Sequence, residues 1–225
     1  MFDRIIKLIG EDKFKLIQDK HILLIGVGGV GSAALETLVR SGFQNIQIID
    51  YDKVDISNLN RQLITDISNI GELKVNAAYK RMKLINPDIN LSCQAVKLTE
   101  DNLITILDSG FDYVIDACDD IDIKFELIKL SLKMDFKLIE SMGTAKKIDP
   151  SKLSITTLDK TTYDPIAKIL RKKLRDNKIN TKVRVVSSTE EMIKSDYLGT
   201  LSMVPNTAGI LLVTYIIKDI LKENT

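Results

Sequence analysis

The sequence of 225 residues lacks tryptophan, and it contains one histidine, two cysteines and only 5% aromatic residues. The two cysteines, Cys93 and Cys118, are too few for a disulfide framework or a four-thiolate zinc site. A net charge of +1 does not by itself indicate a polyanionic partner. The longest apolar run, Ala208–Ile217, has 10 residues, and a membrane-spanning helix needs about 20. Because no charged-then-apolar leader is recognisable either, we expect a reduced, cytoplasmic, globular protein.

Short apolar runs alternate with longer amphipathic stretches through residues 1–145, which is the pattern of a parallel sheet with crossover helices. The expected strands are His21–Ile25, Asn45–Asp50, Ile89–Gln94, Asp112–Asp116 and Lys137–Glu140. The expected helices are Val30–Ser41, Glu72–Asn86, Glu100–Leu107 and Ile121–Met134. We therefore predict an α/β fold, with a Rossmann-like, mostly parallel sheet and helices on both faces.

Residues 146–225 differ in character, and we interpret them as a basic α+β extension of the same domain. Between Lys146 and Arg184 there are 12 Lys+Arg against 4 Asp+Glu, a local charge of +8. The segment Ala167–Lys178 fits an amphipathic helix with Ile169, Leu170 and Leu174 on its apolar side. Its basic side chains form either a solvated face or a contact surface for a phosphate backbone. The candidates for such contacts are Lys168, Arg171, Lys172 and Arg175.

The closing segment, from Val204 onward, predicts a strongly apolar helix whose apolar surface is wider than a single core-facing stripe. Core burial is one explanation, and a share in a homodimer interface is the other.

The strongest local motif is the apolar strand that runs into GVGGVG and then into a helix. Its glycines Gly26, Gly28 and Gly31 have the spacing G-x-G-x-x-G, and Gly29 lies between them. These glycines allow a tight turn, a close approach of the backbone to a phosphate and close packing of helix on strand. Asp50 ends the next strand, where a carboxylate can accept ribose hydroxyls. The pattern predicts a nucleotide site without specifying the nucleotide.

The segment after Asp50 favours a triphosphate over a dinucleotide, because it adds fixed amide and cationic donors. These residues are Asp52, Asn58, Asn60, Arg61 and Lys74. At the end of the fourth strand, Asp116, Asp119 and Asp120 are expected to face the phosphates. An aspartate there can hold Mg²⁺, and Asp119 or Asp120 can instead cap the next helix.

The ordered motifs GVGGVG, D-x-D, SNLNRQ, IGELK and DACDD resemble the ThiF and ubiquitin-activating-enzyme superfamily, which adenylates carboxylates with ATP. The resemblance covers residues 1–145. It implies that Gly28 and its neighbours hold ATP, that Asp50 binds the ribose, and that Asp119 holds Mg²⁺. It further implies phosphate contacts from Asn58, Arg61 and Lys74. Arg4 resembles the N-terminal arginine that reaches the triphosphate of the partner subunit, which implies a homodimer.

Members that activate a ubiquitin-like C-terminus usually carry two C-x-x-C pairs, and this chain has none. The segments ESMGTAKKIDPSKLSITTLDKTTYDPIAKILRKKLR and VPNTAGILL are similar to the tRNA threonylcarbamoyladenosine dehydratase (TcdA, CsdL-like) subfamily. That resemblance implies adenylation of the free carboxylate of the modified adenosine beside the anticodon, followed by ring closure by its own carbamoyl group. An intramolecular nucleophile explains why no acyl-enzyme cysteine is needed. The basic region then becomes a tRNA surface.

Two alternatives remain open from the sequence. One is an adenylyltransferase for the C-terminus of a ubiquitin-like sulfur carrier, in which a sulfur-relay protein is a partner and Cys118 a nucleophile. The other is a nucleotide-binding or NAD-binding regulatory module without adenylation chemistry. The stretch between Arg184 and Leu198 is short for the family, and its effect on substrate contacts is a further open point.

Overall fold

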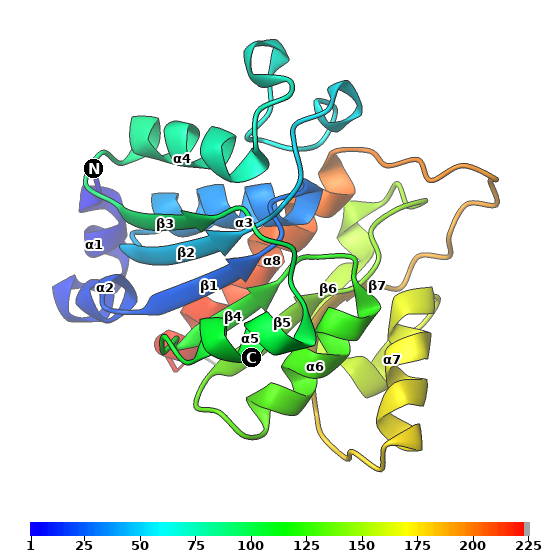
Figure 1. Cartoon of the computed structure of the whole chain (residues 1–225). Coiled ribbons are helices and arrows are strands. Elements are labelled where there is room, and N and C mark those ends of the chain that lie inside the picture. The colour runs from blue at the N-terminus through cyan, green and yellow to red at the C-terminus, as the bar shows by residue number, and fades with distance from the viewer. Residues whose placement is uncertain (223–225) are drawn as a thin grey trace.

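The computed structural model describes residues 1–222, and it contains one seven-stranded sheet between two layers of helices (Figure 1). The strand order is β3-β2-β1-β4-β5-β7-β6, and all neighbours are parallel except the antiparallel pair β6 and β7. The strands are β1 (His21–Ile25), β2 (Asn45–Ile49), β3 (Asn90–Gln94), β4 (Tyr113–Asp116), β5 (Lys137–Ser141), β6 (Leu153–Thr157) and β7 (Arg184–Ser188). The predicted α/β fold with a mostly parallel sheet is confirmed.

The two helical layers bury both faces of the sheet, which explains why its central strands are apolar without interruption. One layer contains α3 (Gly29–Arg40), α4 (Lys74–Ile85) and α8 (Met203–Ile220). The other contains α5 (Glu100–Leu107), α6 (Ile121–Ser131) and α7 (Pro165–Asp176). Side chains of β1 alternate between the layers, since Ile22 and Leu24 join the first core and Leu23 and Ile25 join the second.

Several elements were not predicted from the sequence. Two short helices, α1 (Asp3–Ile9) and α2 (Glu11–Gln18), precede the sheet. Single turns of 3₁₀ helix lie at η1 (Ile56–Asn58), η2 (Ile67–Asn69), η3 (Pro150–Lys152) and η4 (Leu158–Lys160). Strands β6 and β7 continue the main sheet, so the basic region shares its core. In α7 the buried side chains are Ala167, Leu170 and Leu174, and the prediction for Ile169 was wrong because this residue is 42% exposed.

The closing helix α8 is long and apolar enough to cross a membrane by length and composition, but half of it is buried inside the fold. It packs closely on α3, where a side chain at Gly209 would collide with the backbone at Val30 and Ala34. It also contacts β5, β6 and β7, together with α2 and η3. Core burial between a helix and a sheet therefore accounts for most of its apolar width.

Candidate functional site

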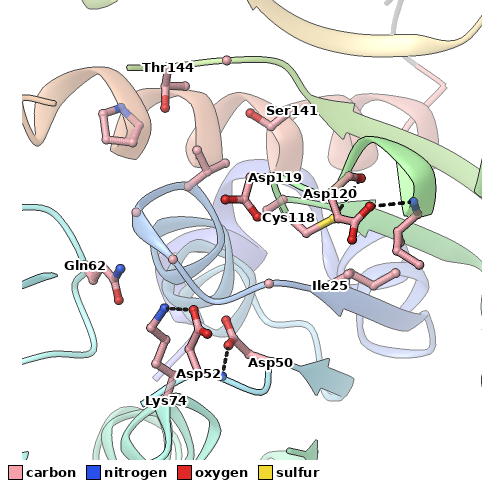
Figure 2. A pocket seen from close by; sticks show the side chains of 18 of the residues that line it. Ile25, Asp50, Asp52, Gln62, Lys74, Cys118, Asp119, Asp120, Ser141 and Thr144 are labelled. Atoms are coloured by element: carbon pink, nitrogen blue, oxygen red, sulfur yellow. Dashed lines mark hydrogen bonds and ion pairs between the residues drawn. The ribbon is translucent and has the colours of Figure 1, made fainter. Parts of the chain in front are cut away.

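A cavity of about 790 Å³ opens at the carboxyl ends of the parallel strands, where the strand order reverses between β1 and β4 (Figure 2). Ligands of doubly wound folds bind at this position. The cavity brings together nine residues predicted from the sequence, which come from four separate segments. They are Gly26, Gly28, Gly29, Asp50, Asp52, Asn58, Arg61, Lys74 and Asp119.

The glycine loop forms the wall of the cavity between β1 and α3. Gly26 has a φ of 82°, a left-handed conformation that glycine adopts without strain. A side chain at Gly31 would collide with the carbonyl oxygen of Gly26. Gly31 is buried behind the wall, so it permits the packing of α3 on the loop and does not line the cavity.

The carboxylate of Asp50 connects the glycine loop to the segment after β2. Its Oδ2 accepts a hydrogen bond from the backbone N–H of Val27 at 2.8 Å, and its Oδ1 accepts one from that of Asp52 at 2.8 Å. Burial raises the pKa of Asp50, although these two hydrogen bonds oppose the shift. Asp50 thus shapes the site, and its contact with ribose stays a prediction.

Lys74 is the first residue of α4, and its side chain is only 8% exposed at the edge of the cavity. Its Nζ lies 2.7 Å from Oδ2 of Asp52, whose side chain is 49% exposed. Figure 2 shows this pair at the side of the cavity next to Asp50. An ammonium group has three donors, so the ion pair orients Lys74 and leaves further donors for an anion.

Arg61 and Asn58 are positioned by the η1 turn. The Nη1 group of Arg61 donates to the carbonyl of Ser57 at 2.6 Å and to Oδ1 of Asn60 at 2.8 Å. Oδ1 of Asn58 accepts from the backbone N–H of Asp55 at 3.1 Å, which completes a capping box. Both side chains therefore stabilise the η1 region, in addition to the phosphate contacts predicted for them.

Gln62 also lines the cavity, and the sequence-based site set did not include it. The residue is only 5% exposed, and within the described part of the chain its Oε1 atom is buried without a hydrogen-bond partner. A buried polar atom is costly when it has no partner, so an orphaned amide in a cavity points to a ligand. The sequence feature that could have indicated Gln62 is its position directly after Arg61 in the SNLNRQ motif.

The three aspartates after β4 have three different environments. Asp120 caps α6 by accepting from the backbone N–H groups of Asp122 and Ile123. Asp119 is exposed and lines the cavity. Asp116 does not face the phosphates as predicted, because it is fully buried below the cavity, 3.0 Å from Nζ of the buried Lys124. Lys124 lies eight residues further along the chain, on α6, and the sequence-based reasoning did not identify this pairing.

Cys118 contributes to the cavity lining, but its environment disfavours a nucleophile. Burial, together with the nearby charge of Asp116, raises the pKa of the Cys118 thiol well above its ordinary value. The reactive thiolate is therefore disfavoured near neutral pH. Within residues 1–222, no group of three or more His, Cys, Asp or Glu side chains is arranged as a metal cluster.

The loop between β7 and α8 borders the cavity with Leu198 and Thr200. It is attached to Lys146, whose backbone N–H donates to the carbonyl of Gly199 at 2.8 Å and whose carbonyl accepts from Ile193 at 2.8 Å. The side-chain amide of Asn60 donates to the carbonyl of Thr200 at 2.9 Å. This loop thus contributes to the border of the cavity, and its shortness relative to the family stays an expectation from the sequence.

The remaining predicted residues lie outside this cavity. Arg4 is exposed on α1. The four basic residues of α7 that were predicted to contact a phosphate backbone line a second cavity of about 440 Å³. Arg171 differs from the other three, because its Nη1 donates to the carbonyls of Leu158 and Thr161 and anchors the η4 turn. Lys168, Lys172 and Arg175 are exposed.

The fold and the cavity define a nucleotide-binding α/β protein of the doubly wound class. The ThiF family matches residues 2–225, and the chain belongs to this family. It is 37% identical to the tRNA threonylcarbamoyladenosine dehydratase of Bacillus subtilis, over 96% of this chain and 92% of that protein. The Escherichia coli protein of the same name is 34% identical, over 90% of this chain and 78% of the relative.

A solved structure of E. coli tRNA N6-threonylcarbamoyladenosine dehydratase in complex with ATP is similar throughout. Its TM-score is 0.93 at 33% identity, covering 98% of this chain and 93% of that one. The family resemblance predicted from the sequence is confirmed.

Proposed function

We propose that this protein is an ATP-dependent tRNA threonylcarbamoyladenosine dehydratase, which closes the threonylcarbamoyl group of the modified adenosine beside the anticodon into a ring. The single observation that carries this conclusion is the convergence of the glycine loop with acidic, amide and cationic side chains on one cavity. Relatives at 34% and 37% identity bear this name, and ATP is bound in the similar E. coli structure.

In this reaction the free carboxylate of the substrate attacks the α-phosphate of ATP and pyrophosphate leaves, which produces an acyl-adenylate. The carbamoyl group of the same modification then attacks the activated carbonyl, loses a proton and expels AMP, so that one water is lost overall. The first step builds negative charge on the leaving pyrophosphate. Arg61 and Lys74 line the cavity and are proposed to neutralise that charge. The N-terminus of α3 and the glycine loop are proposed to donate backbone N–H groups to the phosphates.

Mg²⁺ is proposed as a cofactor held by Asp119. The donor chemistry fits, because Mg²⁺ binds one or two carboxylates together with substrate phosphates and does not need a full protein cage. Asp120 is occupied as the cap of α6, which leaves the Asp119 carboxylate at the cavity. When bound, the ion would neutralise phosphate charge.

A homodimer is proposed from the surface of the N-terminal region. Every residue of α1, all within the described chain, remains at least partly exposed, and Leu8 is 82% exposed. A weakly packed helix that exposes an apolar side chain fits an interface with a second copy. Arg4 on the same helix would then be available to the partner's cavity, the role implied by the family resemblance.

Four further assignments belong to the proposal. Residues 1–145 supply the ATP-binding region, and residues 146–225 the tRNA-facing and dimer-forming extension. The exposed bases Lys168, Lys172 and Arg175 contact the tRNA backbone. The enzyme is cytoplasmic, and a sulfur-relay protein is a candidate partner.

Mass spectrometry of tRNA nucleosides from cells lacking this protein tests the function. The cyclised adenosine should disappear and return on expression of the wild-type chain, but not of an Arg61→Ala variant. Unchanged cyclised adenosine in the deleted cells would contradict the proposal. Activation of a ubiquitin-like carrier by the purified protein, with no effect on tRNA, would support the sulfur-carrier alternative.

A further inference from the structure

One wall of the main cavity has no role in the binding of ATP described above. It consists of Ser141 at the end of β5, the loop residues 142–145 that follow it, and Ile166 in the first turn of α7. This wall lies beside Asp119 and across the cavity from the Asp52–Lys74 pair, with Ser141 and Thr144 facing inward (Figure 2). A substrate that approaches the triphosphate from the open side contacts this wall.

Both backbone polar groups of Gly143, in the middle of the wall, are held by one buried ion pair. The N–H of Gly143 donates to Oδ2 of Asp164 at 2.9 Å, and its carbonyl accepts from Nζ of Lys147 at 3.1 Å. Nζ of Lys147 lies 3.7 Å from Oδ2 of Asp164, and the two side chains are 1% and 0% exposed. We call these three residues the Gly143 clamp.

The second carboxylate oxygen of Asp164 belongs to another element. Its Oδ1 accepts a hydrogen bond from the backbone N–H of Ala167 at 2.9 Å and caps the N-terminus of α7. Pro165 follows at the first helical position, and Tyr163 precedes with a φ of 53°, an uncommon conformation for a bulky residue. One carboxylate thus holds the cavity wall with one oxygen and the basic helix with the other.

The energetics of the clamp favour a geometric role over a stabilising one. Burial lowers the pKa of Lys147, with Asp164 opposing the shift, so the charged pair carries a desolvation cost. A buried ion pair of this kind is often replaceable by apolar residues without loss of stability. What apolar residues could not supply here is the set of directed hydrogen bonds that fixes Gly143 relative to Ala167.

We infer that Asp164, together with Lys147, is a positioning residue that sets the substrate wall at a fixed distance from the tRNA-binding face of α7. When the RNA backbone lies on Lys168, Lys172 and Arg175, the modified base then reaches that wall at the correct distance from ATP. The inference rests on the proposed function. In this reaction the same tRNA contacts α7 with its backbone and the cavity wall with its modified base. These two contacts must be held relative to each other to within about 1 Å, and the clamp explains how.

The substitution Asp164→Asn separates the two bonds, because Gly143 and Ala167 donate to different oxygens of Asp164 and asparagine replaces one of these oxygens by an NH2 group that cannot accept. The cap survives well with asparagine, so the bond to the wall is the one expected to be lost. With purified protein, ATP and tRNA carrying threonylcarbamoyladenosine, the dissociation constants for ATP and for tRNA should stay within about threefold of wild type. The single-turnover rate at saturating tRNA should fall by about 10²-fold.

Lys147→Gln provides a second variant, since it keeps a donor for the Gly143 carbonyl and removes the buried charge. We expect a smaller loss of rate, again with both dissociation constants retained. The matched control is Asp149→Asn, which alters the cap of η3 outside the clamp and should react at the wild-type rate. A merely structural role would lower the melting temperature and the active fraction without this separation of binding from rate.

Wild-type rates in both clamp variants would overturn the inference, as would weakened tRNA binding with an unchanged rate from the bound complex. Either result leaves the proposed function intact, because the wild-type protein still reacts. A wild-type protein that does not cyclise the modified tRNA would overturn the proposed function and, with it, the inference.

Discussion

Lys74 and Asp52 contact each other twice, through an ion pair of 2.7 Å between Nζ and Oδ2 and through a backbone hydrogen bond of 2.9 Å from the N–H of Lys74 to the carbonyl of Asp52. The first residue of α4 is thereby tied to the segment after β2, which also carries Asp50. The ammonium group of Lys74 is thus held at the cavity by a backbone hydrogen bond and by an ion pair, as expected for a preorganised electrostatic site.

Removing either cation should reduce the reaction with little loss of the fold. Arg61→Ala and Lys74→Ala should each lower product formation by about 10²-fold, the scale for loss of one preorganised donor. Because Lys74 is buried, its replacement should also lower the melting temperature. The replacement of Arg61 should lower it less, because the two hydrogen bonds that this side chain donates are exposed to solvent. The control is Lys80→Ala, an exposed position on the same helix outside the cavity. Full activity in both variants would exclude these residues from phosphate binding.

The nucleotide preference can be measured by thermal shift. ATP with Mg²⁺ at 100 times its dissociation constant should stabilise the protein by about 2.7 kcal/mol, because it binds only the native state. NAD should have little effect, and Asp119→Asn should remove the additional shift due to Mg²⁺ while retaining a response to ATP alone. Strong stabilisation by NAD but not ATP would contradict an adenylating enzyme.

Replacing Cys118 should leave most of the activity intact. Burial and the charge of Asp116 raise the pKa of the thiol, so a thiolate that could form a thioester is disfavoured. Cys118→Ala should keep the rate within about threefold of wild type, since the substrate supplies its own nucleophile. A folded, ATP-binding Cys118→Ala protein without activity would instead support a thiol-transfer mechanism.

Charge reversal on α7 tests the tRNA surface. Lys168, Lys172 and Arg175 changed together to Glu should weaken tRNA binding and reduce the slope of log affinity against log salt by about one unit per lost contact. Arg171 is left in place because it anchors the η4 turn. The control reverses three exposed lysines elsewhere, Lys13, Lys15 and Lys133. If both triple variants bind tRNA equally well across the salt series, α7 is not the contact surface.

We expect Glu140 to make the stability of the protein depend on pH. It is fully buried next to Asp116 across β4 and β5, and burial with that neighbouring charge raises its pKa well above the ordinary value. The folded protein keeps a proton that the unfolded chain releases above about pH 4.3. The contribution of Glu140 to stability is therefore fully present below that pH and falls as the pH rises towards the folded-state pKa of this group.

Glu140→Gln removes the requirement for that proton. Its melting temperature should exceed that of wild type by a margin that grows between about pH 5 and about pH 8. Glu191→Gln, at an exposed position, should follow the wild-type curve. Parallel curves for Glu140→Gln and wild type would mean that Glu140 is ionised in the native state.

Features whose cause is local could be predicted from the sequence. The turn at Gly26 needs a residue that tolerates positive φ, and the cap at Asp120 needs a short polar side chain just before a helix. Strand and helix patterns likewise depend on neighbours a few positions away. The convergence of Asp50 and Asp119 followed from one topological rule, that parallel strands end at the same edge of the sheet, whereas Lys74 was predicted from the family resemblance.

Features that depend on contacts between distant segments were decided only by the tertiary structure. Asp116 does not face the cavity, because it lies beside Lys124 and Glu140 below it. Arg171 differs from the exposed basic residues of α7, because its guanidinium donates to carbonyl groups of the η4 turn. Gln62 became a candidate once its buried amide oxygen was found without a partner among the described residues. The sequence by itself determined the family, the sheet and the glycine loop through local backbone preference and apolar period. The direction of each charged side chain depended on packing, because burial makes an unpaired charge costly and only the folded chain supplies its partner.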